Sequence, residues 1–343
     1  MGTMRAAVLV KPNLFDLREV AVPEIADDEV LVRVHRTGIC GTDLHMFLGH
    51  YAADRLPLIP GHEFVGTAAK KGSRVSNVKE GDRVVVDINI GCGTCFWCRR
   101  NEVLNCPAIS QLGIHRNGAF AEFVAVPARL VIPAPSSLSD AELALTEPIA
   151  CVVRAARKAE VHFGQSVVIL GAGPIGNLHV QMMRLCGAAP IIVSDISAQR
   201  CKMALDAGAD VIVSDPQTLR QIVLDHTNGR GADVVIESVG NAKLYQTAFE
   251  LIRKGGHVAF FGITGPTDTV AVNILDTILK ENSMKGSVAG MGEDMHDALV
   301  LLQHGRFKTG LFTSAAYPVE KIQSAFETVA TRPADLKTQI IFA

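Results

Sequence analysis

Residues 166–176 read Ser-Val-Val-Ile-Leu-Gly-Ala-Gly-Pro-Ile-Gly, an apolar run that passes directly into a glycine-rich turn. A continuous aliphatic run of this length predicts a strand that is buried on both faces. The pattern G-x-G-x-x-G between a strand and a helix is typical of dinucleotide binding, because it permits a tight turn and a close approach of the backbone to a pyrophosphate. We therefore expect a dinucleotide to contact Gly171, Gly173, Pro174, Ile175 and Gly176.

The residues that follow this turn strengthen the same interpretation. A helical stretch runs to about Cys186, and a second apolar strand covers Ile191–Ser194 and ends at Asp195. A carboxylate at that position accepts hydrogen bonds from the ribose hydroxyls and repels a 2′-phosphate. The sequence therefore favours NAD over NADP, although Arg200 lies nearby and offers a positive charge.

Strands and helices continue to alternate through this half of the chain. We expect a helix over about 198–206 and strands over 211–213, 233–237 and 257–261, with helical segments between them. This alternation predicts a doubly wound parallel sheet, in which ligands bind beyond the carboxyl ends of the strands. The turns at two of those ends supply further candidate cofactor contacts, namely Val239, Phe261, Gly262 and Ile263. The alternative is that both are ordinary βα turns without a ligand.

The part of the chain before Gly164 has a different character. Short Val- and Ala-rich segments bounded by Gly, Pro or Asp predict strands at 4–10, 30–36, 64–70, 82–87 and 119–126. No helical periodicity appears before about Ser139, so a β-rich, barrel-like domain is expected there. Helical stretches are then expected at 146–159, 295–303 and 319–329, and a last strand at 339–342.

A candidate metal site lies between Cys40 and Glu63. The stretch Cys40-Gly-Thr-Asp-Leu-His45 is followed by Gly61-His62-Glu63. A thiolate, an imidazole and a carboxylate are ligands that zinc accepts, and three protein ligands leave one position open for chemistry. Each residue alone reads as a buried cysteine, a core histidine or a surface carboxylate. A hydroxyl, a second carboxylate and a proton carrier join them at Thr42, Asp43 and His45.

A second cluster has the spacing Cys92-x2-Cys95-x2-Cys98-x7-Cys106. Four thiolates this close in sequence can close a tetrahedral zinc shell. Two alternatives compete with that interpretation. An iron–sulfur run of the ferredoxin type has three residues before its last cysteine rather than seven, and a zinc ribbon needs two separated cysteine pairs.

Composition limits the classes of function that the chain can have. The 343 residues are 48% hydrophobic and 20% charged with a net charge of −2, which gives no electrostatic case for nucleic acid or an anionic membrane. No apolar run has the length of a membrane span, and no export signal is recognisable, so a cytoplasmic location is expected. The eight cysteines then read as ligands and reduced thiols.

These motifs, in this order, resemble the zinc-dependent medium-chain dehydrogenase/reductase family, in the branch with sorbitol and other polyol, butanediol and threonine dehydrogenases. The resemblance implies a GroES-like β-rich catalytic domain over 1–150 and 288–343, with a structural zinc lobe at about 91–107. It implies a Rossmann NAD-binding domain over 151–287. It also favours contact of the two strand-end turns with the cofactor, and a homo-oligomer that is a tetramer rather than a dimer.

The resemblance also assigns roles to the candidate residues. It implies two zinc ions per chain, a structural one on the four cysteines and a catalytic one on Cys40, His62 and Glu63. Glu147, which alone reads as a helix N-terminal carboxylate, is then a ligand or a partner of the metal-bound water. Asp43 orients His62, and Thr42 touches the substrate oxygen and passes its proton to His45.

The implied reaction moves a hydride from a small polar secondary alcohol, such as a polyol, diol or hydroxy amino acid, to NAD and leaves a ketone. Sorbitol-type enzymes usually carry an arginine–aromatic pair where this chain has Val288-Ala289-Gly290, which shifts the expectation toward short diols or a differently anchored polyol. The alternatives are a dehydrogenase of the same fold for primary alcohols or aldehydes, a zinc-free reductase of enones or quinones, and a non-catalytic dinucleotide-binding regulator.

Overall fold

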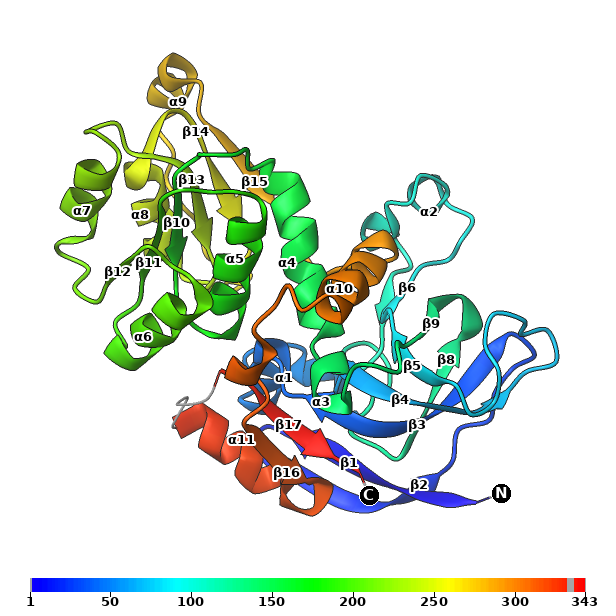
Figure 1. Cartoon of the computed structure of the whole chain (residues 1–343). Helices are drawn as coiled ribbons and strands as arrows, with labels where there is room; N and C mark the ends of the chain where they lie inside the picture. Colours follow the sequence, from blue (N-terminus) through cyan, green and yellow to red (C-terminus); the bar gives the residue numbers. More distant parts are fainter. Residues whose placement is uncertain (1, 332–335, 343) are drawn as a thin grey trace. The chain divides into compact units, whose positions relative to one another are not determined.

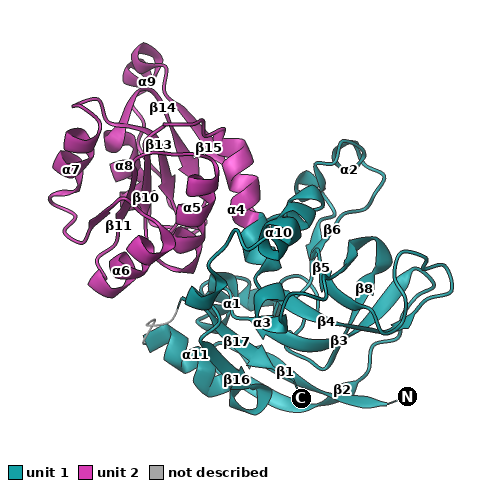
Figure 2. Ribbon diagram, in the orientation of Figure 1, with its two compact units in different colours: residues 1–150, 289–343 teal, residues 151–288 magenta. Residues whose placement is uncertain are grey.

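The computed structural model describes residues 2–331 and 336–342 and divides the chain into two compact units (Figures 1 and 2). Unit 1 comprises residues 1–150 and 289–343, and unit 2 comprises residues 151–288. Helix α4, Thr146–Ala159, has the bounds expected from the sequence and carries the chain from the first unit into the second. The chain therefore leaves unit 1, completes unit 2, and returns to unit 1.

Unit 1 is built around a seven-stranded sheet with the order β16-β17-β3-β4-β5-β9, with β8 paired to β3. Its pairings are antiparallel except for that of β16 with β17. A separate ribbon pairs β1 with β2, and a short one pairs β6 with β7. The strands are β1 Thr3–Lys11, β2 Leu14–Ala21, β3 Glu29–Gly38, β4 Glu63–Lys71, β5 Arg83–Val86, β6 Asn89–Ile90, β7 Ser110–Gln111, β8 Phe123–Pro127, β9 Val131–Pro133, β16 Ala315–Pro318 and β17 Thr338–Ile341.

A cluster of buried phenylalanines joins distant parts of unit 1. Phe326 on α11 (Ile322–Thr331) lies with its ring centroid 4.8 Å from Phe15, 5.2 Å from Phe47 and 5.7 Å from Phe120. Large buried aromatic rings of this kind contribute several kcal/mol each to a core. Because Phe47 ends helix α1, Gly41–Phe47, the cluster holds in place the helix that carries Thr42, Asp43 and His45.

Some sequence expectations for unit 1 were wrong. Residues before Ser139 include helix α1 and the single-turn helix α2, Phe96–Arg99, because elements of one or two turns are too short to show a helical period. The strand expected over 119–126 is β8 at Phe123–Pro127, and Ala119–Glu122 lies outside it. The remaining helices are α3 Asp140–Leu143, α10 Glu293–Gln303, and α11, which is preceded by a 3-10 turn at Val319–Lys321.

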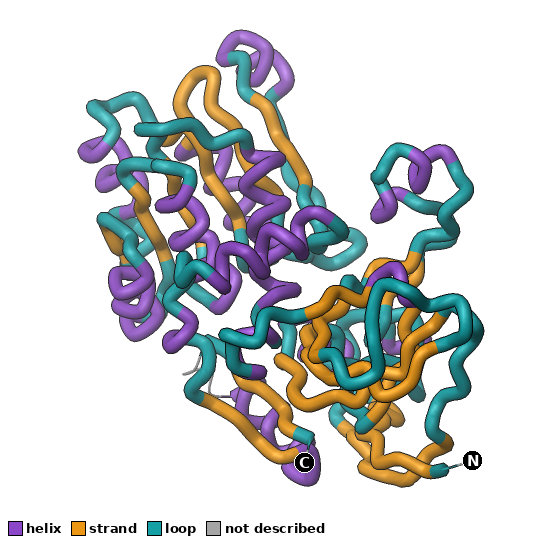
Figure 3. Tube along the Cα trace, turned by 45° about the vertical axis from the view of Figure 1, so that its right-hand side comes forward, coloured by secondary structure: helices purple, strands orange, loops and turns teal. Residues whose placement is uncertain are grey.

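Unit 2 is a six-stranded parallel sheet with the order β12-β11-β10-β13-β14-β15. Figure 3 shows its strands alternating with helices along the chain. The strands are β10 Val167–Leu170, β11 Ile191–Ser194, β12 Val211–Val213, β13 Ala232–Glu237, β14 Ile252–Phe260 and β15 Ser283–Gly286. The helices are α5 Pro174–Leu185, α6 Ala198–Ala207, α7 Leu219–His226, α8 Ala242–Leu251 and α9 Ile274–Lys280.

This strand order confirms the doubly wound fold. Chain order reverses at β10, which pairs with β11 on one side and β13 on the other. All four residues of β10 are buried, as the continuous aliphatic run predicted. Such a reversal forms a crevice at the carboxyl ends of the strands, where dinucleotides bind. In the described part of the chain, no helix has both the length and the apolar character needed to cross a lipid bilayer.

Candidate functional site

The structure brings Cys40, His62 and Glu63 together in unit 1. One ligand atom from each lies within 4.8 Å of the other two. Cys40 precedes helix α1, His62 precedes strand β4, and Glu63 is the first residue of that strand. His62 and Glu63 are buried and Cys40 is half-buried. A buried thiol, imidazole and carboxylate at this separation form a set that a zinc ion can join.

Asp43 fastens the two segments that carry these ligands. Its fully buried carboxylate accepts a 2.9 Å hydrogen bond from the backbone N–H of Cys40 and a 3.2 Å bond from that of Gly61. Its Oδ1 also lies 3.3 Å from His62 Nδ1, without the alignment of a hydrogen bond. Burial lowers the pKa of His62, but the charges of Asp43 and Cys40 outweigh it and leave the pKa well above its ordinary value.

Lys337 is a member of this site that the sequence interpretation missed. Its buried Nζ donates a 2.5 Å hydrogen bond to Glu63 Oε1 and lies 2.5 Å from Oε2. Burial lowers the pKa of Lys337, and the neighbouring Glu63, Cys40 and Glu147 raise it more, so the ammonium stays charged. Among the described residues, Oε2 accepts no hydrogen bond of acceptable geometry, although Lys337 Nζ lies 2.5 Å from it, so a metal ion bound at Glu63 would share this carboxylate with the ammonium.

The remaining candidates of unit 1 lie around this set. Thr42 is half-buried on α1, and His45 is exposed on the same helix, with its ring centroid 6.2 Å from that of His50. Partial removal of the ring from water, followed by the charge of His50, lowers the pKa of His45. Glu147 is buried in the first turn of α4, outside the group whose ligand atoms converge.

The four spaced cysteines converge on a second point. Cys92, Cys95, Cys98 and Cys106 each place a sulfur within 4.8 Å of the others, and none of the chain's eight cysteines forms a disulfide. Backbone N–H groups point at the sulfurs, as from Cys95 to Cys92 Sγ at 3.4 Å. Hydrogen bonds from Thr94 and Cys95 lower the pKa of Cys92 to about 6. These donors stabilise the thiolate form, which is the form that binds metal.

The glycine-rich turn of unit 2 has the shape that dinucleotide binding needs. Gly173 is the N-cap of α5 and Pro174 occupies its first turn. A Cβ added at Gly173 would meet no atom within 4 Å, so this face of the backbone is open. A Cβ added at Gly176 would lie 1.9 Å from Gly171 O, so the helix packs directly on the preceding turn. Ile175, like Pro174, is half-buried.

Asp195 already accepts two backbone hydrogen bonds. Ala172 N–H of the glycine turn donates to its Oδ2 at 2.8 Å, and Ser197 N–H donates to its Oδ1 at 2.8 Å. The carboxylate is therefore fixed beside the turn in the first half of the sheet. Arg200 lies on α6 and is half-buried, and its backbone N–H donates to the capping Ser197 hydroxyl.

The turns after β13 and β14 lie against each other. A Cβ added at Gly262 would lie 2.0 Å from Gly240 N, which shows how closely the two backbones approach. Val239 and Ile263 expose 51% and 52% of their surface, although both are aliphatic. Phe261 is half-buried, and its ring packs edge-on against His179 of α5 at 4.8 Å. This edge of the sheet therefore presents apolar surface at the carboxyl ends of its strands.

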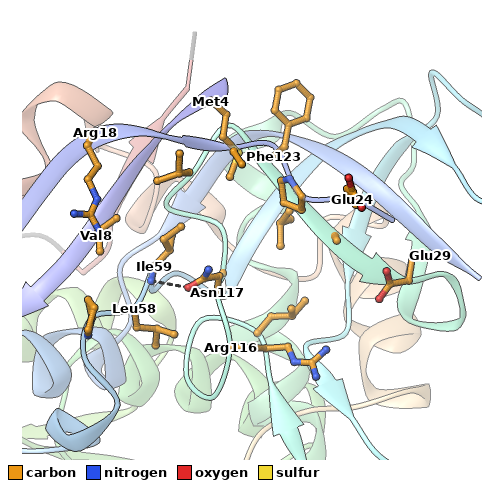
Figure 4. Close-up of a pocket in the computed structure, with 18 residues that line it drawn as sticks. Met4, Val8, Arg18, Glu24, Glu29, Leu58, Ile59, Arg116, Asn117 and Phe123 are labelled. Carbon is orange, nitrogen blue, oxygen red and sulfur yellow. Dashed lines mark hydrogen bonds between the residues drawn. The ribbon is translucent and has the colours of Figure 1, made fainter. Parts of the chain in front are cut away.

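A groove of about 640 Å³ lies elsewhere in unit 1 and is shown in Figure 4. Met4, Val8 and Leu58 are among its apolar lining residues, and a 3.1 Å hydrogen bond from Ile59 N–H to Asn117 Oδ1 holds its wall. None of the converging metal ligands or dinucleotide candidates lines it. We therefore assign the groove no part in the chemistry of the ligand set.

The residues present fit both a metal ion and a dinucleotide. The converging thiol, imidazole and carboxylate include one carboxylate oxygen with no hydrogen-bond partner in the described ranges. The four-cysteine cluster offers four ligands, which would fill a tetrahedral shell and leave no coordination position for a substrate, so it suits a structural zinc ion. The glycine turn, with an open backbone face and a helix N-terminus, suits a pyrophosphate.

Two family models match the sequence. Residues 26–136 match the Alcohol dehydrogenase GroES-like domain, and residues 174–304 match the Zinc-binding dehydrogenase model. The chain is 32% identical to D-arabinitol dehydrogenase 1 of Uromyces fabae, over 96% of this chain and 95% of that protein. It is 32% identical to sorbitol dehydrogenase of Bacillus subtilis, over 94% of this chain and 93% of that one.

A solved structure has the same fold. A zinc-binding dehydrogenase of Sinorhizobium meliloti, bound to NADP, aligns over 100% of both chains with a TM-score of 0.92 and 31% identity. The similarity therefore includes both units and extends over the whole chain.

Proposed function

This chain belongs to the zinc-dependent medium-chain dehydrogenase/reductase family, and we propose that it transfers a hydride from a small polar secondary alcohol to NAD. The protein is an oxidoreductase whose cofactors are zinc and a nicotinamide dinucleotide. We infer from the Asp195 carboxylate that this dinucleotide is NAD. We infer further that each chain holds two zinc ions, one in each converging set of ligands. The observation that carries the proposal is the approach of Cys40, His62 and Glu63 ligand atoms to within 4.8 Å of one another.

The zinc and the nicotinamide supply the chemistry that side chains lack: a Lewis acid that lowers the pKa of an alcohol, and an acceptor for its hydride. The residues of this chain bind and orient. Cys40, His62 and Glu63 would hold the catalytic zinc. Glu147 would act at the coordination position that these three ligands leave open. Asp43 fixes the ligand segments, because it bonds the backbone of both.

Removal of the alcohol proton falls to helix α1. The Thr42 hydroxyl would accept the proton from the substrate oxygen and pass it to His45, whose exposed ring delivers it to water. The lowered pKa of His45 supports this role, because a neutral imidazole can accept the proton at neutral pH. In unit 2, Gly171, Gly173 and Gly176 would hold the pyrophosphate, and Asp195 would bond the ribose hydroxyls.

Two carboxylates near the metal set, Glu63 and Glu147, support a substrate rich in hydroxyl groups. Both are buried, so a substrate bound beside them would meet carboxylates rather than purely aliphatic side chains. Relatives named for arabinitol and sorbitol are in accord with a polyol. Val288-Ala289-Gly290 offers no arginine to such a polyol, which favours a short diol or a polyol bound through other residues.

The test is a screen for NADH absorbance over 2,3-butanediol, threonine, tetritols, pentitols, hexitols, inositols and primary alcohols. We expect the highest kcat/KM with one polar secondary alcohol and a strong stereochemical preference. A preference for a long primary alcohol would show instead that the pocket is apolar. NADH binding without turnover of any alcohol would favour a regulatory role.

A homo-oligomer, with a tetramer preferred to a dimer, is part of the proposal. Helix α9 exposes 65–72% of Ile274, Leu275, Ile278 and Leu279, and it precedes β15, which is an edge strand. A second copy that pairs with this edge would cover those side chains. Sedimentation of a double variant, Ile278→Glu with Leu279→Glu, is expected to show dissociation. We also propose a cytoplasmic location, which the eight free cysteines support.

A further inference from the structure

Glu237 is the last residue of strand β13, and its side chain is fully buried, which is unusual for a carboxylate. Its carboxylate accepts hydrogen bonds from three successive backbone N–H groups of the following turn. They come from Val239 at 3.1 Å, Gly240 at 3.0 Å and Asn241 at 3.4 Å. A buried carboxylate with several N–H donors stabilises one backbone conformation, since any other leaves it without partners. Glu237 therefore fixes the conformation of residues 238–241.

The same residue reaches the neighbouring turn. The backbone carbonyl of Glu237 accepts hydrogen bonds from Phe261 N–H at 3.2 Å and from Gly262 N–H at 3.0 Å. Tyr245 of helix α8, which is buried, donates a 2.6 Å hydrogen bond from its hydroxyl to the carbonyl of Gly262. Glu237 thus holds the N–H group of Gly262, and Tyr245 holds its carbonyl group.

Glycine at position 262 allows this arrangement. A Cβ there would lie 2.4 Å from Glu237 Oε2, as well as 2.0 Å from Gly240 N. The two turns, residues 238–241 and 261–263, are consequently one packed layer around the Glu237 carboxylate. Burial, and then the charge of Glu237, raises the pKa of Tyr245, so its hydroxyl remains a donor. We call Glu237 and Tyr245 the turn clamp.

The position of the turn clamp in the sheet indicates which part of the cofactor it serves. Strands β10–β12 form the first mononucleotide-binding half, which includes the glycine turn and Asp195. Strands β13–β15 form the second half, and in this fold each half takes one nucleotide of the dinucleotide. The exposed Val239 and Ile263 therefore belong to the half that takes the nicotinamide nucleotide.

We propose that Glu237 and Tyr245 are positioning residues for the nicotinamide half of the cofactor. Both are buried, so they act through the turns that carry Val239 and Ile263 and not by touching the cofactor. They fix the surface on which the nicotinamide nucleotide rests. This inference rests on the proposed function, because it assumes that the dinucleotide occupies the crevice of unit 2.

The test compares NADH with ADP-ribose, which has the adenine half and both phosphates but no nicotinamide. Binding to the zinc-loaded protein is measured by NADH fluorescence and, for ADP-ribose, by calorimetry. Tyr245→Phe removes the hydrogen bond to the Gly262 carbonyl. Glu237→Gln replaces Oε2, which accepts a 3.0 Å hydrogen bond from Gly240 N–H, by an NH2 group that cannot accept it. For both variants we expect the Kd for NADH to rise on the order of tenfold, since each loses a hydrogen bond that fixes a turn. The Kd for ADP-ribose is expected to change less than about twofold, because its contacts lie in the other half.

Asp233→Asn is the matched control. Asp233 stands near the opposite end of the same strand, where its carboxylate accepts hydrogen bonds from Ser166 N–H at 2.9 Å and its hydroxyl at 2.6 Å. Loss of stability alone would affect this variant as it affects Glu237→Gln, whereas a positioning role predicts unchanged NADH affinity in Asp233→Asn.

Equal weakening of NADH and ADP-ribose in the clamp variants, or no weakening of either, would overturn the inference. So would a selective loss of NADH affinity in Asp233→Asn. Tyr245→Phe removes a single hydroxyl, so it provides the measurement if Glu237→Gln does not fold. If the wild-type protein binds neither ligand, the dinucleotide part of the proposed function fails, and the inference fails with it.

Discussion

Lys337 Nζ lies 2.5 Å from both carboxylate oxygens of Glu63, and both side chains are almost completely removed from water. A buried ion pair is stable mainly because each charge compensates the other, so its two members depend on each other. Glu63 is also a member of the converging ligand set. Lys337 and a metal ion would therefore compensate the charge of the same carboxylate from different sides.

The first prediction follows from this pairing. Lys337→Met leaves a buried carboxylate without its partner and should lower the free energy of unfolding by about 3–5 kcal/mol in the zinc-depleted protein. Zinc bound at Glu63 would supply positive charge, so the loss should be smaller in the zinc-loaded protein. Urea unfolding of both forms measures this, with Lys337→Arg as the control that keeps the charge. An equal loss in both forms would contradict a metal ion beside Glu63.

The second prediction separates the two metal sets. Cys40→Ser should lower kcat/KM by a factor on the order of 10³ or more, because several kcal/mol of transition-state stabilisation depend on the ion held there. The far-ultraviolet circular dichroism should not change. Zinc content measured by elemental analysis should fall from two ions per chain to one. Two ions in an inactive variant would mean that Cys40 is not a ligand.

The third prediction concerns the four-cysteine lobe. Cys106→Ser should lower the thermal midpoint and the zinc content before it affects turnover, because a closed metal site is coupled to folding. Cys151→Ser is a matched control, since Cys151 is also a buried cysteine that forms no disulfide but lies outside both ligand sets. Iron with inorganic sulfide in the purified protein would rule out a zinc lobe.

The fourth prediction addresses the cofactor. Asp195→Asn removes the negative charge that opposes a 2′-phosphate but keeps an oxygen that can accept one of the two backbone hydrogen bonds. The ratio of kcat/KM for NADP to that for NAD should rise by about tenfold or more, as expected for loss of a charge repulsion of about 1.4 kcal/mol. A wild-type enzyme that prefers NADP would refute the assignment of Asp195.

The fifth prediction concerns pH. His179 on α5 is fully buried, neither of its ring nitrogens has a hydrogen-bond partner among the described residues, and burial lowers its pKa from 6.5 to about 3. Between these values the unfolded chain binds a proton that the folded chain does not. His179 therefore costs no stability above about pH 6.5. Below that pH it lowers the free energy of unfolding by up to about 1.4 kcal/mol for each pH unit.

His179→Leu should remove that dependence. Between pH 7 and pH 5, the wild-type protein should lose about 2 kcal/mol more free energy of unfolding than the variant does. Denaturant unfolding at the two pH values measures the difference, and His226→Leu, which changes an exposed histidine, is the control. Parallel pH curves for wild type and His179→Leu would show that His179 is not a neutral buried group.

The sequence predicted most reliably what is encoded locally. The aliphatic run, the glycine turn, the second strand and Asp195 follow one another within 30 residues, and the structure places them as one strand–turn–helix–strand unit. Helix α1 was missed because a helix of seven residues is too short to show a helical period. Its start is marked by the bond from Cys40 N–H to the Asp43 carboxylate, but cysteine is not a residue that predicts a helix N-cap.

Long-range partners were the part that the sequence could not supply. Lys337 is 274 positions from Glu63, and a single lysine next to a strand reads as a surface residue. The turn clamp had a weak local signal, since Glu237 follows three consecutive aliphatic residues at the end of its strand. Its bonds to the turn after β14 depend on how two strands of the sheet align, and that alignment is set by tertiary packing.

The phenylalanine cluster has a consequence for the order in which the protein is made. Phe326 and Lys337 follow all of unit 2 in the chain. Phe326 nevertheless packs against Phe47 at the end of helix α1, and Lys337 compensates the charge of Glu63. The ribosome therefore completes the nucleotide-binding sheet before the metal-binding half receives its last supports. If Cys40, His62 and Glu63 bind zinc as we propose, the capture of that ion would be a late event of biosynthesis.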